Sequence, residues 1–282
     1  MTEQEKTLVI YIDWWLWRVI AMSWAITEKA KQQKVKVITS RPLVFWWNPY
    51  IVSVHWTGDR RLYEDVIKGN DYLILEPYTD SRFFNDWMNW LEVAKEQLWL
   101  GEVAEPILFL AEHEKLENVL AWEKPILFQP FWSTMQLNWA DKSYRSIKVD
   151  DAQYIADRLI KKGYTVYVVE RDDQPKLKGC TQLTVDNMRW LVTLCARYPV
   201  VWCDSSLHHA AKAFNKHAVV VWSGTDAWRF GYPSHTNMRT EAEYNYVPFR
   251  LWVDFNTDII NQHTNTYTKE FLDEVVENTL KI

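Results

Sequence analysis

The sequence predicts an α/β protein built from two doubly wound domains, each with a parallel sheet, facing a cleft. Short β-branched runs alternate with helical stretches, which is typical of β-α-β units. A polar stretch at 112–124, followed by Pro125, divides these runs into two series. The chain has 282 residues, which accommodates two domains at about 150 residues each. A single larger α/β sheet is the alternative.

Nine strands are predicted because short apolar runs recur between polar or helical segments. The first series contains Leu8–Ile12, Val35–Ile38, Ile51–Val54, Tyr72–Leu75 and Ile107–Leu110. The second series contains Ile126–Phe128, Thr165–Val169, Val200–Trp202 and Ala218–Val221. Ligands of such sheets bind at the carboxyl ends of the strands, so the residues that follow each strand are the first candidates for a site.

Helices are predicted between these strands at 18–33, 60–68, 82–98, 150–162, 186–197 and 206–214. The 150–162 segment places Ile155, Leu159 and Ile160 on one face, and Gly163 follows as a cap residue. A last helix at Thr268–Leu280 has an apolar stripe that requires a packing partner. We therefore expect domains at 1–120 and 121–250, followed by a tail and helix at 251–282.

The composition excludes several classes of protein. The chain is 48% hydrophobic and 24% charged, as in ordinary globular domains. Its net charge of −5 gives no protein-wide basic field for nucleic acid, so a DNA partner would need a local patch. The three cysteines have no metal-binding spacing, and the first residues lack the pattern of a signal peptide. We expect a soluble, cytoplasmic protein without a membrane span.

The clearest candidate site follows the Val200–Trp202 strand. There the sequence Asp204-Ser205-Ser206-Leu207-His208-His209 leads into a helix rich in small residues. Helix N-termini bind phosphate through free N–H groups and the positive end of the helix dipole. An ordinary Asp or Ser cap of a helix is the alternative reading.

Two neighbouring strand ends add polar side chains to this site. Ser223 and Thr225 follow the Ala218–Val221 strand, whereas Ser133 and Thr134 follow the Ile126–Phe128 strand, with Arg145 downstream. This set suits a diphosphate better than a metal. The remaining histidines are scattered, and His208 and His209 are expected on different helix faces, so no metal site is predicted.

These residues resemble the motifs of glycosyltransferase family 9, the heptosyltransferase-like enzymes of the GT-B fold. The family pattern Asp-Ser-Gly-x-x-His-x-Ala-x-Ala is matched by Asp204, Ser205, Ser206, His209, Ala211 and Ala213. A following Phe-Gly-x-Thr is matched by Trp222, Ser223 and Thr225, and Gly-Pro by Gly231-Tyr232-Pro233. The resemblance covers most of residues 125–235.

The resemblance implies two Rossmann-like domains, with a nucleotide-diphosphate sugar on the second and the acceptor on the first. It implies an inverting, metal-independent transfer without a cofactor, in which Ser133, Thr134, Arg145, His209 and the Ser205-Ser206 helix end neutralise the leaving group. It also implies that the last helix packs back on the first domain. The acceptor is a carbohydrate hydroxyl or, as in small bacteriophage relatives, a modified base in DNA.

The first domain departs from the family pattern at its expected catalytic carboxylate. The family has Gly-Asp where this chain has Trp17-Arg18. Asp13 is the nearest substitute for the base that takes the acceptor proton, and Arg18 occupies the position of the family aspartate. A turn aspartate at a strand end is the alternative reading of Asp13.

Glycine is scarce and tryptophan abundant, at 7 and 18 residues. Tryptophan stands where related chains have glycine or another small residue, at Trp14, Trp15, Trp17, Trp24, Trp132 and Trp202. Glycine there permits positive φ and lets the backbone approach phosphate, and Trp does neither. Three interpretations are open. The sequence is an altered form of a family chain, or its loops are rebuilt around aromatic side chains, or the indoles stack on a sugar or base ring of a ligand. A GT-B scaffold that no longer accepts a donor, acting as a binding module, is the rival function.

Overall fold

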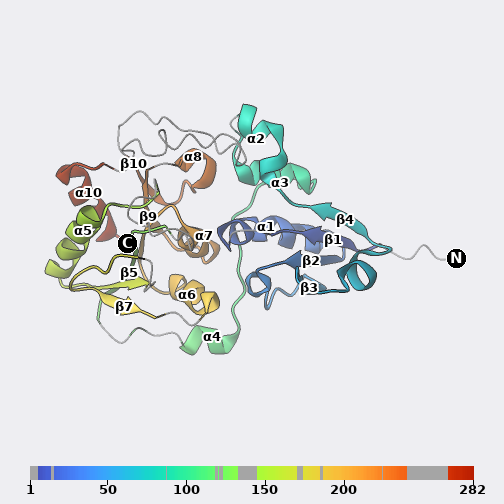
Figure 1. The fold of residues 1–282 in the computed structure, drawn as a ribbon, viewed down its shortest axis with the longest axis horizontal. Coiled ribbons are helices and arrows are strands. Elements are labelled where there is room, and N and C mark those ends of the chain that lie inside the picture. The colour runs from blue at the N-terminus through green and yellow to red at the C-terminus, as the bar shows by residue number, and fades with distance from the viewer. Residues whose placement is uncertain are drawn as a thin grey trace. The chain divides into compact units, whose positions relative to one another are not determined.

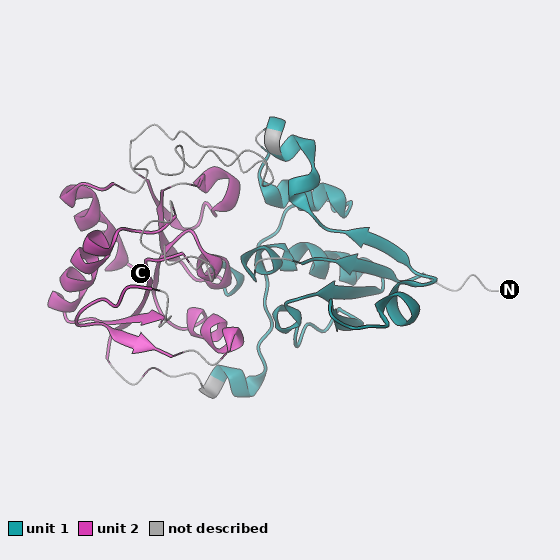
Figure 2. Cartoon of the chain, viewed as in Figure 1, with its two compact units in different colours: residues 1–117, 212–214 teal, residues 118–211, 215–282 magenta. Residues whose placement is uncertain are grey.

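The computed structural model describes residues 6–13, 16–86, 88–117, 120, 123–132, 145–169, 174–184, 187–223, 225–239 and 266–282. The chain forms two compact units (Figure 2). Unit 1 contains residues 1–117 and 212–214, and unit 2 contains 118–211 and 215–282. The division falls within the polar stretch 112–124.

Unit 1 contains a parallel sheet in the order β3-β2-β1-β4 (Figure 1). Its strands are β1 (Leu8–Tyr11), β2 (Val35–Thr39), β3 (Ser53–Trp56) and β4 (Asp71–Ile74). The helical elements are α1 (Leu16–Gln32), η1 (Pro42–Val44), η2 (Tyr63–Ile67), η3 (Pro77–Thr79), α2 (Ser81–Asn85), α3 (Trp90–Gln97) and α4 (Glu112–Glu117). The central strand β1 pairs with β2 on one side and β4 on the other, so its carboxyl end lies between two neighbours.

Two predictions for unit 1 are wrong. The predicted strand Ile107–Leu110 is not a strand, and the Ile107 N–H instead donates to Ser23 Oγ at 3.0 Å. The predicted helix 82–98 is divided into α2 and α3, because the Asn89 side chain accepts from the Leu91 N–H and begins a new helix. Local apolar content did not distinguish a paired strand from an extended segment.

Unit 2 contains a parallel sheet of six strands in the order β10-β9-β8-β5-β6-β7. The strands are β5 (Pro125–Gln129), β6 (Thr165–Val169), β7 (Thr181–Leu183), β8 (Val200–Cys203), β9 (Ala218–Trp222) and β10 (Thr236–Arg239). Numbered within the unit, this is the order 3-2-1-4-5-6 of dinucleotide-binding folds, whose ligands bind where the order reverses. Here that point lies between β5 and β8, which pair directly.

The helices of unit 2 are α5 (Val149–Lys161), α6 (Met188–Cys195), α7 (Ser206–Ala213), α8 (Ala227–Phe230) and α10 (Lys269–Thr279). Gly163 follows α5 with a φ of 86°, which confirms its predicted role after the helix end. The sequence did not predict β7 and β10. Both are edge strands with polar residues, as in Thr236-Asn237-Met238-Arg239, so they lack the apolar signal of a buried strand.

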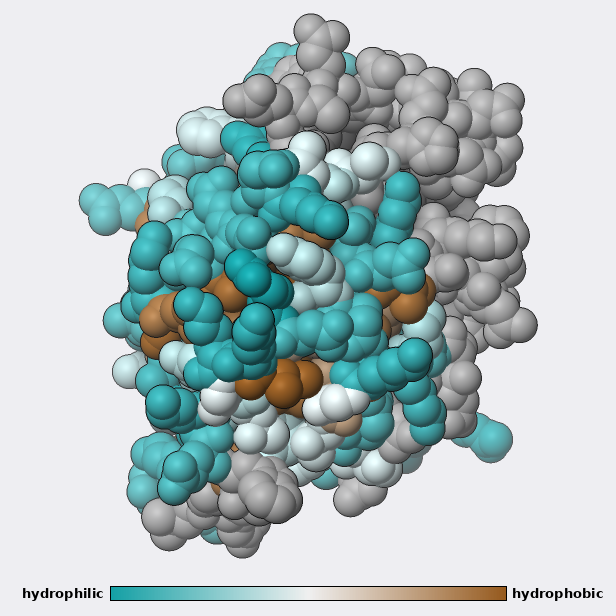
Figure 3. All heavy atoms as spheres, turned by 90° about the vertical axis from the view of Figure 1, so that its left-hand side faces the viewer, coloured by the Kyte–Doolittle hydropathy of each residue, from teal (hydrophilic) through white to brown (hydrophobic). Residues whose placement is uncertain are grey.

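The last helix packs differently from the prediction. Leu272, Val275 and Val276 of α10 are buried in the core of unit 2, together with Ile155 and Leu159 of α5. Tyr154 and Arg158 of α5 also bond to Asp273, at 3.0 and 2.9 Å. The apolar stripe therefore finds its packing partner on α5, within unit 2. The face of unit 2 that carries α5 and α10 is mainly hydrophilic (Figure 3), because both helices turn their apolar residues inward.

Several tryptophans occupy environments that suit a smaller residue. Trp47 and Trp99 have φ angles of 64° and 52°, in the left-handed region that glycine adopts without steric cost. Trp24 and Trp202 are buried at predicted glycine positions, and their indole nitrogens have no hydrogen-bond partner among the described residues. Burying an unbonded N–H costs free energy. Tryptophan is therefore unfavourable in two ways, through left-handed backbone at Trp47 and Trp99 and through buried, unbonded indole N–H groups at Trp24 and Trp202.

Replacing Trp47 and Trp99 together by glycine should raise the free energy of unfolding by about 1 kcal/mol. Left-handed backbone costs a non-glycine residue about 1–2 kcal/mol, and the greater freedom of the unfolded glycine chain offsets about 0.4–1 kcal/mol per site. Both side chains are exposed, at 57% and 72%, so little burial is lost. Urea unfolding monitored by circular dichroism measures the change.

Trp228→Gly is the matched control, because this equally exposed tryptophan (68%) lies within α8. Glycine there should lower the free energy of unfolding by about 1 kcal/mol through its poor helix propensity. A double glycine variant that unfolds at a lower urea concentration than the parent would contradict the assignment of strain to Trp47 and Trp99.

Candidate functional site

The candidate site lies at the carboxyl ends of β8, β5 and β9 in unit 2. Strand β8 is buried along its whole length and ends at Cys203, after which Asp204 and Ser205 lead into α7. Ala210 and Ala211 of α7 are fully buried, so their small side chains allow close packing. Because β8 pairs with β5 and β9, the residues that follow these strands gather at one edge of the sheet.

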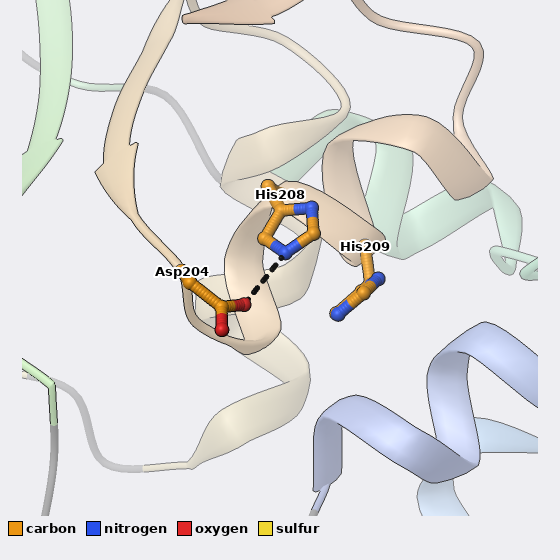
Figure 4. Close-up of side chains that lie close together, drawn as sticks. All are labelled: Asp204, His208 and His209. Atoms are coloured by element: carbon orange, nitrogen blue, oxygen red, sulfur yellow. Dashed lines mark hydrogen bonds and ion pairs between the residues drawn. The ribbon is translucent and has the colours of Figure 1, made fainter. Parts of the chain in front are cut away.

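Asp204 is the central residue of this edge (Figure 4). Its Oδ2 accepts a hydrogen bond from Thr225 Oγ1 at 2.6 Å and lies 3.5 Å from Arg145 Nη1. Its Oδ1 lies 3.3 Å from His208 Nε2. Burial raises the pKa of Asp204, but Arg145, His208 and Thr225 together hold that pKa below its ordinary value. The carboxylate is therefore ionised and joins the segments after all three strands.

The two histidines of α7 lie side by side and do not diverge. Their ring centroids are 3.7 Å apart, and both side chains are buried. The prediction that His208 and His209 point to different faces is wrong, since side-chain torsions bring the rings together although the Cα positions differ by one residue. Figure 4 shows His208 turned toward Asp204 with His209 beside it.

The environment of His209 keeps its ring neutral. Its Nδ1 is hydrogen-bonded to the Tyr232 hydroxyl at 2.7 Å. Burial lowers the pKa of His209 well below its usual range, and His208, His235 and Arg145 lower it further. A neutral imidazole in this position can donate or accept a hydrogen bond but carries no charge of its own.

Arg145 supplies the positive charge of the site. Its side chain is 7% exposed and pairs with Asp204, and its guanidinium carbon lies 5.0 Å from the ring centroid of Trp132. The Trp132 N–H donates to Ser146 Oγ at 2.9 Å, which fixes this loop after β5. Trp132, at a predicted glycine position, thus lies directly against the candidate phosphate-binding cation.

The structure brings together three of the predicted residues, Asp204, Arg145 and Thr225. His209 lies beside His208, which in turn faces Asp204. Ser223 is buried at the same strand end as Thr225, and Ser205 and Ser206 lie at the start of α7. The Ser205 hydroxyl has no hydrogen-bond partner among the described residues. Ser133 and Thr134 lie outside the described residues, so their predicted role stays a prediction.

Sequence reasoning missed His208, Tyr232 and His235 as members of this site. His235 Nε2 lies 3.1 Å from the backbone oxygen of His208, and Tyr232 contacts His209. The spacing of four residues between Asp204 and His208 was a usable signal, because such residues are neighbours on a helix. The contacts of Tyr232 and His235 depend on how the 231–235 loop folds over α7, and local sequence does not encode that.

The candidate residues of unit 1 lie at the carboxyl end of β1 and in α1. Asp13 Oδ1 accepts from the Ser40 N–H at 3.0 Å, and Oδ2 accepts from the Tyr11 hydroxyl at 3.1 Å. Burial first, and then Asp13, raises the pKa of Tyr11 to about 12, so the phenol remains a donor. The bond from Ser40 ties the end of β1 to that of β2.

Arg18 is buried in an ion pair with Glu76, which lies two residues after the end of β4 and which sequence reasoning did not select. Its guanidinium carbon lies 5.4 Å from the centroid of the Tyr78 ring. The Glu76 side chain also accepts from the Tyr78 N–H at 3.2 Å. Arg18 therefore connects the start of α1 to the end of β4, and these contacts give it a structural role.

No protein-family model matches the sequence, and neither does any curated protein. Solved structures do match. The iron-containing dodecameric glycosyltransferase TibC from enterotoxigenic E. coli gives a TM-score of 0.72 at 15% identity, over 99% of this chain and 77% of TibC. TibC has also been solved in complex with ADP-D-β-D-heptose.

Two further structures show the same similarity. The E. coli ADP-heptose LPS heptosyltransferase II gives a TM-score of 0.62 at 16% identity, over 97% of this chain and 99% of that enzyme. A family 9 glycosyltransferase from Veillonella parvula gives 0.60 at 13% identity, over 84% of this chain and 86% of that one. The chain therefore has the GT-B fold of heptosyltransferase-like proteins, which confirms the predicted fold family. Within the described residues, no helix has both the length and the apolar character needed to cross a membrane.

Asp204→Asn should lower the free energy of unfolding by about 3 kcal/mol at neutral pH, because it breaks the buried ion pair with Arg145. The pKa of Asp204 is lowered in the folded state. Its contribution is therefore complete above the unfolded pKa of about 3.9 and is lost as pH falls through the folded value. Urea unfolding across pH 3–7 should show that the difference in free energy of unfolding between parent and variant becomes smaller toward low pH.

Thr225→Val is the control, since it removes one hydrogen bond to the same carboxylate and no charge. It should cost about 1 kcal/mol with little change over this pH range. Equal losses for both variants at pH 7 would show that the charge pair between Arg145 and Asp204 does not stabilise the site.

Proposed function

We propose that this chain is a glycosyltransferase that takes a sugar from a nucleotide-diphosphate sugar bound to unit 2. The observation that supports this most directly is the cluster of Arg145, Thr225 and His209 around Asp204. It lies where the strand order reverses in a sheet of the dinucleotide-binding order. ADP-heptose, the donor seen in TibC, is the first candidate.

The proposed transfer forms a bond between an acceptor oxygen and the anomeric carbon and breaks the bond from that carbon to the diphosphate. Arg145, together with the N–H groups at the start of α7, neutralises the charge that develops on the leaving diphosphate. Neutral His209 contributes a hydrogen bond. The transfer proceeds with inversion at the anomeric carbon. The negative charge of the leaving diphosphate is neutralised by these protein groups, without a metal.

Asp13 is the proposed base for the acceptor proton. It accepts hydrogen bonds from Tyr11 and Ser40, and its place after β1 is a ligand-binding position in such sheets. Arg18 is proposed as a residue that positions the carboxyl edge of the unit 1 sheet through its ion pair with Glu76. This assignment differs from the family pattern, in which a carboxylate stands at position 18.

The acceptor is proposed to be a carbohydrate hydroxyl, with a modified base in phage-type DNA as the alternative. The net charge of −5 does not favour DNA. The rival function is a binding module whose loops no longer accept a donor, and the stacking of Trp132 on Arg145 supports that rival. Calorimetry with UDP-, ADP-, GDP- and CMP-sugars separates the two, because only an enzyme-like site binds one of them selectively.

His209→Ala should weaken binding of the nucleotide-diphosphate sugar by about 1.5–3 kcal/mol, the range for a hydrogen bond to a charged group. This corresponds to about 10- to 150-fold in Kd, measurable by calorimetry with ADP-heptose. His217→Ala is the control, because His217 is exposed and bonded to Thr236. Equal affinity of both variants would place the diphosphate elsewhere.

Replacing Trp14, Trp15, Trp17 and Trp132 by glycine should raise donor affinity or turnover. Trp132 covers the Arg145 guanidinium, and the Trp17 ring lies 5.0 Å from the Trp90 ring, tilted by 38°. Trp14 and Trp15 lie outside the described residues. Glycine at position 132 would uncover the Arg145 guanidinium and restore backbone access to the diphosphate, whereas at position 17, in the first turn of α1, it would remove the indole. Calorimetry and a transfer assay measure the change, and weaker donor binding in the variant would show that the tryptophans are walls that stack on the ligand.

A further inference from the structure

Strand β4 ends the sheet of unit 1 on the side where the sheet of unit 2 continues (Figure 1). Counted from the central strand β1, β4 takes the place that β8 takes beside β5, and β8 is paired on both sides. Among the described residues, no strand pairs with the outer side of β4. The segment Ile107–Leu110, expected as a fifth strand, is instead tied to Ser23 of α1. Such an edge strand presents N–H and C=O groups to which another strand can pair.

The outward backbone groups of β4 belong to Tyr72 and Ile74. The N–H groups of Asp71 and Leu75 donate to backbone carbonyls at the two ends of β1, at 3.1 and 2.9 Å, so these residues direct their peptide groups toward β1. Successive residues of a strand alternate in direction. The N–H and C=O groups of Tyr72 and Ile74 therefore face away from β1, toward the open side of the sheet.

The side chains of the same two residues are also exposed. Tyr72 and Ile74 lie opposite Val9 and Tyr11 of β1, on the face that η2 covers through Val66. They remain 44% and 56% exposed, although both faces of a parallel sheet are normally covered. Natural edge strands often carry Lys, Pro or a bulge that prevents pairing. Strand β4 contains neither Lys nor Pro and pairs with β1 in an unbroken register.

We propose that β4 pairs antiparallel with β4 of a second copy of this chain, around a twofold axis at Leu73. In this register Tyr72 lies opposite the partner's Ile74, and the same pair recurs on the other side of the axis. Each pair exchanges two N–H···O bonds, because the outward groups of both residues then face one another. Tyrosine opposite isoleucine is a favourable cross-strand pair, and these side chains lie on one face of the joined sheet.

A second copy fits this edge better than a strand of another protein. The pattern is symmetric about Leu73, so the edge is its own complement, as a twofold interface requires. The one charged residue of β4, Asp71, is already paired with Lys6 at 3.6 Å, so the edge does not select a charged peptide. Further along, the Gln97 side chain bonds to the N–H and carbonyl of Glu76, at 3.2 and 3.1 Å, which stops a longer strand from pairing.

So short a contact buries less than the about 1,200 Å² of stable interfaces, so the dimer is weak and depends on concentration. Sedimentation equilibrium of the full chain at up to about 1 mM detects dissociation constants of that size and should show a reversible dimer. Ile74→Lys should weaken the association at least about 10-fold, because lysine on an edge strand opposes pairing. Val52→Lys is the matched control, since Val52 is equally exposed (57%) but precedes β3, at the other edge of the sheet.

Cysteine variants test the register directly. Leu73→Cys should form a disulfide-linked dimer on air oxidation, because facing residues at a non-hydrogen-bonded antiparallel position have Cα atoms about 4.5 Å apart. Ile74→Cys should cross-link poorly, since its two copies are displaced by two residues along the strands.

A parent chain that stays monomeric up to about 1 mM would overturn the proposal and leave a strand of another protein as the occupant of this edge. Association of Ile74→Lys equal to that of the parent would also overturn it, as would equal cross-linking of the two cysteine variants. Circular dichroism establishes that each variant is folded. No nucleotide sugar is used, so failure of dimer formation is distinguishable from failure of the proposed transferase.

Discussion

The buried carboxylate of Asp204 is the constraint on which the second domain's candidate site depends. It accepts from Thr225, pairs with Arg145 and lies beside His208, so it links the residues that follow three adjacent strands. Removing that anion would take away the negative charge that is paired with the buried Arg145, and breaking a buried ion pair is strongly unfavourable. The same negative charge that orders the edge also holds the guanidinium in place for an anionic ligand. Stability and proposed ligand binding therefore share one interaction.

The first domain is organised around a different ion pair. Arg18 and Glu76 connect the start of α1 to the end of β4, and Asp13 joins the ends of β1 and β2. Position 18, where the family resemblance leads one to expect a carboxylate, is thus part of a buried ion pair in this chain. In the proposed transfer the acceptor proton therefore goes to Asp13, which accepts hydrogen bonds from Tyr11 and Ser40.

The tryptophans affect both domains through backbone geometry and buried polar atoms. Trp47 and Trp99 adopt glycine-type backbone angles, and Trp132 lies against Arg145. The sequence comparison with family motifs had predicted some glycine-type positions, such as Trp132 and Trp202. It did not identify Trp47 and Trp99, because positive φ is visible only once the loops are folded. The scarcity of glycine is therefore a structural feature of the chain as well as a compositional one.

The sequence by itself determined the alternation of strands and helices, the two series of strands and the Asp204 to His209 motif, because these depend on local apolar periodicity and short spacing. Only the tertiary structure decided that α10 packs on α5, that β7 and β10 extend the second sheet, and that the rings of His208 and His209 lie together. Those outcomes depend on contacts between residues distant in sequence and on side-chain torsions. Local sequence patterns determine neither the long-range contacts nor the side-chain torsions.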